Sequence, residues 1–293
     1  MPEASFLFGQ FLGGLTTAMF LFLIASGLSL VFGVMRVLNF AHGSFYMIGA
    51  YLAWQVVQWL APMNGFWPAV LAAALGVALL GGVVERFLLH RLYGREELYQ
   101  LLFTYALVLI LGDVAKAAWG TRQLSVSRPP ILSGSFDLAG TTLPAYNLFI
   151  MLIGPAIAVA VWAALTRSTA GRMVRAAALD REMLGAMGAN VGAIYTWMFV
   201  VSSFLAGLSG ALVTPIQSIV PGMDVEIIVE AFIVVVIGGL GSFWGTFWGS
   251  VIYGQVLSFG ILIFPSFSIF SVFALMAVIL IVRPWGLFGR PLR

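Results

Sequence analysis

One polar stretch, residues 166–197, separates two long apolar parts of the sequence and reads TRSTAGRMVRAAALDREMLGAMGANVGAIYTW. The chain has 14 Lys and Arg residues and 11 Asp and Glu residues, and six of these charged side chains lie between Arg167 and Glu182. Long apolar segments precede and follow the stretch. A polar island in such a chain must lie in water on one side of a membrane.

Apolar residues within the polar island recur at helical spacing. The residues that share one helical face are Ala176, Leu179, Met183 and Met187. The arginines that lie off this face are Arg172, Arg175 and Arg181. Ser168 or Thr169 can cap the start of the helix, and Gly188 or Asn190 can supply a left-handed residue at its end. The sequence predicts one short amphipathic helix outside the bilayer, within a loop of residues 166–195.

This helix is either an ordinary solvated loop helix or a docking surface for a water-soluble partner. On the docking interpretation, Met183 and Met187 form an adaptable apolar knob. The flanking charges, which can pair with the rim of a partner's cleft, are Asp180, Arg181 and Glu182. Gly188 and Asn190 then end the helix and set its angle to the next span.

The composition places the chain among membrane proteins. Hydrophobic residues make up 61% of the sequence and charged residues only 9%, whereas a soluble domain carries about 25% charged residues. Several apolar runs approach the twenty residues that a helix needs to cross a bilayer. We therefore expect an all-α, polytopic membrane protein that forms one transmembrane domain over residues 1–293. The arginines are spread over loop ends, which does not indicate nucleic-acid binding, and Cys is absent.

The apolar runs predict eight or nine transmembrane helices. They cover residues 9–34, 46–60, 67–89, 99–119, 146–165, 193–213, 227–240, 244–264 and 267–282. Residues 46–60 are short for a full crossing. A turn is predicted at residues 62–65, and the loop with Pro129, Pro130 and Pro144 is long enough for a small non-helical excursion.

The positive charges orient the chain. With nine spans, the cytoplasmic side holds Arg36, Arg86, Arg91, Arg95, Arg167, Arg172, Arg175, Arg181, Arg283, Arg290 and Arg293. The outer side then holds Lys116, Arg122 and Arg128. This arrangement places the N-terminus outside and the C-terminus in the cytoplasm. With eight spans the N-terminus would be inside.

The sequence offers no energy source of its own. A P-loop needs a Gly-Lys-Ser/Thr sequence, and Lys116, the only lysine, is flanked by alanines. His42 and His90 lie outside any cluster of metal ligands, so no metal site and no catalytic residue is predicted. Glu230 is interpreted as a carboxylate at the membrane rim rather than as part of a proton relay.

Two stretches interrupt the apolar pattern. The first contains Asn39, His42, Gly43 and Ser44. It is either a simple cytoplasmic turn with Asn39 or Ser44 capping a helix, or a broken helix that exposes backbone groups to substrate. The second, residues 237–250, contains Gly238, Gly239, Gly241 and Ser242 and repeats glycine at Gly241, Gly245 and Gly249. The repeat predicts a seam of close helix packing, and Gly238 and Gly239 predict a flexible break before it.

Four stretches together resemble the permease family of branched-chain amino acid ABC transporters, in its LivH-type form. They are residues 27–51 (GLSLVFGVMRVLNFAHGSFYMIGAY), 187–212 (MGANVGAIYTWMFVVSSFLAGLSGAL), 230–246 (EAFIVVVIGGLGSFWGT) and 283–291 (RPWGLFGRP). NFAHG and GGLGS, in this order and at this separation, are specific motifs. The family often has Lys where Glu230 stands and Ile in the position of Ala189, and the first departure leaves the substrate open.

The resemblance implies an importer of several subunits in the inner membrane. A second, LivM-type permease would pair with this chain, two ATPase subunits would dock on its cytoplasmic side, and a periplasmic protein would deliver substrate. ATP and Mg²⁺ would be used by the ATPases, and no cofactor by this chain. The polar island would be the coupling helix. The substrate would be a branched-chain or related amino acid, with urea, amides and aromatic acids as alternatives. A self-powered secondary carrier is a competing class of function.

Overall fold

The computed structural model describes residues 4–60, 65–138, 140–263 and 265–289. Part of the turn predicted at residues 62–65, and Arg290 and Arg293, lie outside the described residues. The chain is mostly helical, as its composition predicted. The long helices are α1 (Ala4–Met35), α2 (Ala41–Trp59), α3 (Phe66–Phe87), α4 (Glu97–Trp119), α5 (Ala145–Arg167), α8 (Val191–Val213), α9 (Met223–Gly238), α10 (Phe243–Ile263) and α11 (Ser268–Val282).

Shorter elements connect these helices. They are η2 (Leu89–Leu92), η3 (Pro130–Leu132), β1 (Ser135–Leu138), β2 (Thr141–Pro144), α6 (Thr169–Leu179), α7 (Arg181–Ala186) and η4 (Pro265–Phe267). Within the described residues, six helices are long and apolar enough to cross a membrane, namely α1, α3, α4, α5, α8 and α10. The remaining long helices are more polar or shorter, with 16 residues in α9 and 15 in α11. The chain is therefore a multi-pass membrane protein, and the total of eight or nine crossings stays a prediction.

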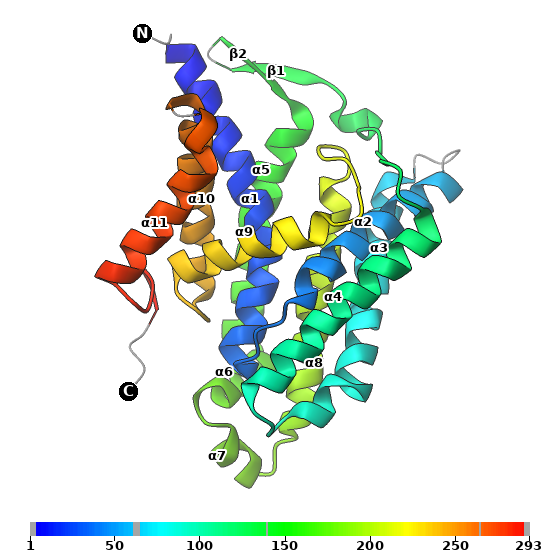
Figure 1. Ribbon diagram of the computed structural model, residues 1–293, viewed down its shortest axis with the longest axis vertical. Coiled ribbons are helices and arrows are strands. Elements are labelled where there is room, and N and C mark those ends of the chain that lie inside the picture. The colour runs from blue at the N-terminus through cyan, green and yellow to red at the C-terminus, as the bar shows by residue number, and fades with distance from the viewer. Residues whose placement is uncertain (1–3, 61–64, 139, 264, 290–293) are drawn as a thin grey trace.

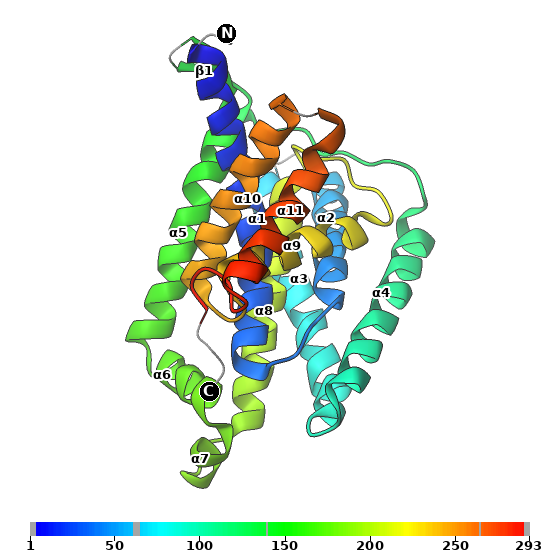
Figure 2. The same ribbon diagram turned by 60° about the vertical axis from the view of Figure 1, so that its left-hand side comes forward.

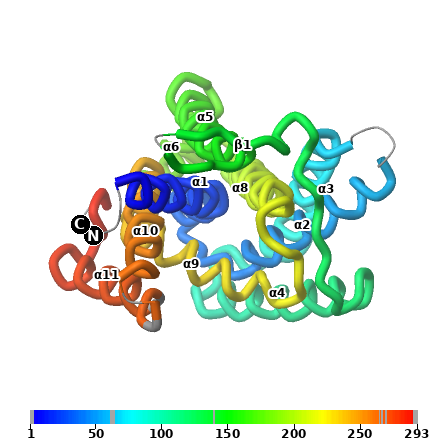
Figure 3. The backbone as a smooth tube through the Cα atoms, turned by 90° about the horizontal axis from the view of Figure 1, so that it is seen from above, coloured from blue at the N-terminus to red at the C-terminus, as the bar shows by residue number. Residues whose placement is uncertain are grey.

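Helices α1 and α8 form the centre of the bundle. Seen from above in Figure 3, α4 and α11 lie at its edge and α9 runs between them. Helix α1 packs on α5, α8, α9 and α10, and α8 packs on α2 and α3. The middle of α1 is buried on every side, which is why its apolar residues show no single stripe.

The two ends of the bundle carry different elements. The start of α1 and the hairpin of β1 and β2 lie at one end, and α6 and α7 lie at the other, beyond the end of α5 (Figures 1 and 2). Helix α9 differs from its neighbours because it crosses the molecule obliquely at mid-height (Figure 1). The bundle thus carries the hairpin at one end and the polar island of α6 and α7 at the other.

The hairpin is the non-helical excursion expected between the fourth and fifth apolar runs. Ser135 pairs with Pro144 and Leu138 with Thr141 in antiparallel register. The Thr141 hydroxyl donates a hydrogen bond of 2.5 Å to the backbone oxygen of Ser5. This bond connects the hairpin to the start of α1. Apart from the two-stranded hairpin, the described fold is helical.

Candidate functional site

The polar island forms two helices rather than the single amphipathic helix that its spacing predicted. Helix α6 ends at Leu179, and Asp180 adopts an extended backbone conformation with φ −151° and ψ 99°. The Asp180 carboxylate then accepts hydrogen bonds of 3.0 and 2.9 Å from the backbone N–H groups of Glu182 and Met183. Asp180 therefore caps a new helix, because a short carboxylate side chain satisfies the free donors of a helix start. Within the chain, one oxygen of the Asp180 carboxylate makes this cap, and its pairing with the rim of a partner's cleft stays a prediction.

The predicted ends of the island are confirmed. The Ser168 hydroxyl accepts a hydrogen bond of 2.9 Å from the backbone N–H of Gly171 and caps α6. Gly188 takes a left-handed conformation with φ +86°. Asn190 is not left-handed; its side chain accepts a 2.9 Å hydrogen bond from Ala193 and caps α8. These caps fix both ends of the connection between α5 and α8.

Three large apolar side chains of the island are open to solvent. Leu179, Met183 and Met187 are 80%, 62% and 79% exposed. Arg181 and Glu182 are also exposed beside them. Ala176 does not join this group, because it is partly buried in α6. An apolar cluster at the polar end of a membrane protein is typical of an interaction surface, and its docking role stays a prediction.

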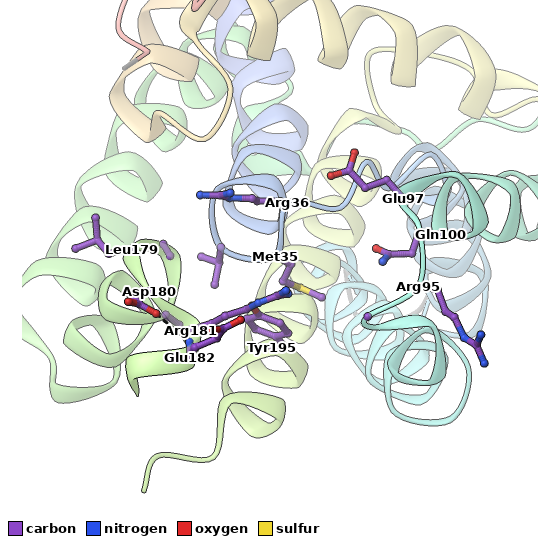
Figure 4. Close-up of a pocket in the computed structure, with 14 residues that line it drawn as sticks. Met35, Arg36, Arg95, Glu97, Gln100, Leu179, Asp180, Arg181, Glu182 and Tyr195 are labelled. Carbon is purple, nitrogen blue, oxygen red and sulfur yellow. Dashed lines mark hydrogen bonds between the residues drawn. The ribbon is translucent and has the colours of Figure 1, made fainter. Parts of the chain in front are cut away.

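A cavity of about 410 Å³ lies beside this surface, between the end of α1, the start of α4, the α6–α7 junction and the start of α8. Figure 4 shows Met35 and Arg36 between the α6–α7 residues on one side and Glu97 and Gln100 on the other. Its charged lining residues are Arg36, Arg95, Glu97, Asp180, Arg181 and Glu182. Both signs of charge are present, so the cavity offers polar partners to a protein segment of either charge.

The residues around the start of α2 are buried, and the expectation that Asn39 or Ser44 caps a helix is wrong. Asn39, His42 and Ser44 are at most 1% exposed. Helix α2 begins at Ala41 without a side-chain cap, and neither Asn39 nor Ser44 caps it. Ser44 instead donates a 2.7 Å hydrogen bond to the Asp224 carboxylate on α9. A side chain on Gly43 would meet the backbone of Asp224, so glycine lets α2 and α9 touch.

His42 lies between three helices. Its Nε2 is 2.9 Å from the backbone oxygen of Ile24 on α1, and its Nδ1 is 3.5 Å from the Ser202 hydroxyl on α8. A carbonyl oxygen only accepts, so Nε2 carries the proton and donates. Asn39 differs, because both polar atoms of its side chain lack a hydrogen-bond partner among the described residues. Unsatisfied buried amides are rare, so Asn39 has polar capacity that the folded chain does not use.

The glycine-rich turn lies at the other end of α9. Gly239 and Gly241 have φ of +106° and +77°, and Gly241 lies against Gly33 of α1. The backbone N–H groups of Leu287 and Phe288 donate 3.0 Å hydrogen bonds to Ile237 and Gly238, so the chain after α11 closes over this turn. Because α9 is about 24 Å long at 1.5 Å per residue, the structure does not bring this turn together with the residues around Ser44.

The predicted glycine seam divides into two parts. Gly245 and Gly249 lie in α10, and an added side-chain atom at either position would meet the backbone of α9. Gly241 precedes α10 and belongs to the turn, so its place in a three-residue helical repeat is wrong. Ser242 accepts a 3.1 Å hydrogen bond from the backbone N–H of Gly245. It therefore stabilises the start of α10.

Glu85 is a buried charged group that the sequence analysis missed. This residue near the end of α3 is fully buried and accepts a 2.7 Å hydrogen bond from the Tyr93 hydroxyl. His90 Nδ1 lies 3.9 Å from the same carboxylate oxygen. The Tyr93 ring packs edge-on against Tyr195 of α8, with centroids 5.5 Å apart. In the sequence Glu85 stands next to Arg86. It therefore looks like an ordinary solvated charge at the end of a helix.

Comparison with known proteins identifies the family. Residues 10–282 match the family model of the branched-chain amino acid transport system permease component. The chain belongs to this family. The match covers nearly every described element, including both candidate regions. The chain is therefore a transport permease and not an enzyme, since the family consists of permease components.

Curated relatives match over almost their full lengths. The chain is 28% identical to the high-affinity branched-chain amino acid transport system permease protein BraD of Pseudomonas aeruginosa, over 99% of this chain and 98% of the relative. It is 27% identical to LivH of Escherichia coli K12, over 96% and 95% of the two chains. It is also 25% identical to LivM of Salmonella typhimurium, over 93% of this chain and 68% of the relative. The permease thus resembles both kinds of subunit, and more strongly BraD and LivH.

Proposed function

We propose that this permease is the LivH-type subunit of an ATP-driven importer for branched-chain or related amino acids in the inner membrane. The match of residues 10–282 to the permease family carries this proposal. The names of the BraD and LivH relatives support the substrate class. Urea, amides and aromatic acids are the alternative substrates, since a separate binding protein would select the substrate.

Power for transport comes from two separate ATPase subunits. The chain contains no P-loop, so ATP and Mg²⁺ are bound by the partners. The exposed cluster of Leu179, Met183 and Met187 supports docking of an ATPase subunit at α6 and α7. Because α7 leads through Gly188 into α8, a shift of the docked helix reaches the membrane-spanning bundle. Rigid-body movement of this kind is a common route to alternating access.

The cytoplasmic side is the end of the bundle that carries α6 and α7. Arg36, Arg95 and Arg181 line the cavity at this end, in agreement with the excess of positive charge on cytoplasmic loops. A second permease of the LivM type and a periplasmic binding protein complete the importer. The opposite end, with the β1–β2 hairpin, would then receive substrate from the binding protein.

Substrate passes beside the buried polar residues at the start of α2. Asn39, with two unsatisfied polar atoms, supports this route most directly. His42 and Ser44 use their polar atoms in contacts to α1 and α9, so they shape the route rather than offer free groups to substrate. Gly238, Gly239, Gly241 and Ser242 form the hinge-like turn at the far end of α9.

Reconstitution of the full importer tests this function. The permease, its LivM-type partner, both ATPases and the binding protein are placed in liposomes that contain ATP, and uptake of labelled leucine, urea and benzoate is measured. We expect leucine uptake that needs ATP and every subunit. Selective uptake of urea or benzoate would show that the substrate belongs to one of the alternative classes and is not a branched-chain amino acid. Uptake by this permease alone, driven by a proton gradient, would instead support a secondary carrier.

A further inference from the structure

Helix α9 carries three carboxylates, and the helices around it offer them no basic partner. The carboxylates are Asp224, Glu226 and Glu230. The helices that pack on α9, namely α1, α2, α10 and α11, contain no Lys or Arg. Within the described part of the chain, none of the three carboxylates forms an ion pair. The negative charge of α9 is therefore not balanced by a cation on the helices packed against it.

The three carboxylates have different surroundings. Glu226 is exposed in the first turn of α9, and Asp224 accepts a 2.7 Å hydrogen bond from Ser44. Glu230 is partly buried in the middle of α9, which crosses the bundle obliquely at mid-height (Figure 1). A carboxylate at such a depth is costly in a membrane protein and normally marks a pathway for substrate or ions. Glu230 is therefore the candidate binding group among the three.

Two tyrosines from other helices lie beside Glu230. Tyr253 of α10 is 4% exposed and Tyr46 of α2 is 1% exposed. The charge of Glu230 acts on the hydroxyl groups of both. The Tyr46 hydroxyl has no hydrogen-bond partner among the described residues, which is uncommon for a buried polar group. Three helices thus bring together one carboxylate and two phenols, and one of the phenols has unused hydrogen-bonding capacity.

The chemistry of these groups favours an ammonium group over other ligands. The carboxylate supplies the opposite charge, phenolic oxygens accept hydrogen bonds from N–H donors, and aromatic rings attract cations. A metal ion does not fit, because the described residues include no cluster of three or more His, Cys, Asp or Glu side chains that could hold one. An anion does not fit either, since the Glu230 carboxylate would repel it.

We propose that Glu230, Tyr46 and Tyr253 form a binding site for the ammonium group of the transported substrate. The proposal rests on the proposed function, because it takes an amino acid as the substrate, and it adds which chemical group this chain recognises. Tyr46 follows Ser44 in the first turns of α2, so the site adjoins the buried polar residues assigned to the substrate route. Urea and benzoate lack an ammonium group, so the site selects amino acids against these alternatives.

Uptake by the assembled importer in liposomes tests the site first. Glu230→Gln keeps the size of the side chain and removes its charge, whereas Glu230→Asp keeps the charge. Glu226→Gln, at the exposed carboxylate one turn earlier, is the matched control. We expect Glu230→Gln to lower ATP-dependent leucine uptake at least tenfold, Glu230→Asp to retain part of it, and Glu226→Gln to leave it unchanged. Wild-type uptake by Glu230→Gln would overturn the proposal.

Protection from chemical modification separates substrate binding from a structural role. The wild-type importer is treated in detergent with dicyclohexylcarbodiimide, and modification of Glu230 is measured by mass spectrometry. Leucine and 3-methylbutylamine, which carry an ammonium group, should each reduce this modification at least fivefold. The compound 4-methylpentanoate, which has the carbon skeleton of leucine without the ammonium group, should not. Equal protection by all three compounds, protection by none, or no modification of Glu230 would each overturn the proposal.

The two measurements also separate this site from the proposed function. If the wild-type importer does not take up leucine, the proposed function itself fails. If wild type and Glu230→Gln take up leucine equally, only the ammonium site is wrong. If Glu230→Gln fails to assemble with its partners, the protection measurement decides, because it uses the wild-type protein.

Discussion

The Tyr93 hydroxyl donates a hydrogen bond of 2.7 Å to the carboxylate of Glu85, which is fully buried near the end of α3. Tyr93 also packs on Tyr195 in the first turns of α8. Glu85 and Tyr93 therefore link α3 to α8, the helix that follows the predicted coupling helices α6 and α7. Burial, and then the Glu85 carboxylate, raises the pKa of Tyr93 well above its ordinary value, so the hydroxyl remains a donor at physiological pH.

Removal of this donor should destabilise the permease. Tyr93→Phe leaves a buried carboxylate without its hydrogen bond, which costs about 1–3 kcal/mol. Thermal unfolding in detergent should show a lower Tm for Tyr93→Phe, while Tyr99→Phe, at an exposed tyrosine on α4, serves as the control. Because the pKa of Tyr93 is higher in the folded state than its unfolded-state value of about 10, the stabilisation is fully present below pH 10. It is lost as the pH rises from there toward the folded-state pKa. The Tm difference between wild type and Tyr93→Phe should therefore shrink above about pH 10; an unchanged Tm at pH 7 would contradict the role.

Met183→Asp should separate the permease from its ATPase subunits. The residue is exposed in the free chain, so insertion and folding should be normal. In a docked complex the new carboxylate would be buried without a partner, at a cost of about 3–5 kcal/mol. Co-purification of tagged permease with the ATPases measures the loss. Ile131→Asp, at an exposed apolar residue at the opposite end of the bundle, is the matched control; wild-type co-purification and uptake by Met183→Asp would show that α7 does not dock.

The two ends of the bundle should face different compartments. The chain has no Cys, so single cysteines can be placed without a background. Met187→Cys and Ile131→Cys lie at opposite ends and replace side chains that are 79% and 82% exposed. In intact cells that express the permease alone, a membrane-impermeant maleimide should label Ile131→Cys only. Labelling of Met187→Cys from outside would reverse the proposed orientation.

Gly245 should tolerate no side chain. An added Cβ would meet the backbone oxygen of Gly238, because α9 and α10 touch at this position. Gly245→Ala should lower stability by about 1–3 kcal/mol, as overpacking does, and Gly245→Leu should lower it further. Trp248→Leu, one turn along on the exposed face of α10, should have a small effect. Equal Tm values for the Gly245 and Trp248 variants would mean that the two helices separate at no cost.

Asn39→Leu distinguishes a role in transport from a role in folding. The side-chain amide of Asn39 is buried and unsatisfied, so an apolar residue of similar size should be neutral or stabilising. If Asn39 borders the substrate route, uptake by the assembled importer should fall at least tenfold while the Tm holds. Ser26→Ala, at another buried polar residue of the bundle, is the control. Full uptake by Asn39→Leu would remove this residue from the route.

Features that depend on short-range chemistry were predictable from the sequence. The membrane class follows from apolar runs and scarce charges, and the Ser168 cap and the left-handed Gly188 follow from local backbone requirements. Specific motifs such as NFAHG and GGLGS were enough to indicate the family. Each of these rests on residues close together in the chain. Such signals are present whatever the distant segments do.

Other features were decided by packing between distant segments. Spacing left the stretch of Asn39 and Ser44 open between a capped turn and a broken helix, but the structure buries both residues and Ser44 bonds to Asp224, 180 residues away. Spacing joined Gly241 to Gly245 and Gly249, but contact with Gly33 of α1 draws Gly241 into the turn.

The burial or exposure of two carboxylates and the break in the polar island were also not predicted from the sequence. Glu85 is buried because Tyr93 folds back over it, and Glu226 is exposed because α1, α2 and α10 cover the other face of α9. At Asp180 the apolar spacing is compatible with one continuous helix, but the Asp180 side chain caps a new helix instead. The sequence by itself determined that the chain is mostly helical and crosses the membrane several times. Only the tertiary structure decided which polar groups are buried, because burial depends on what the distant helices cover.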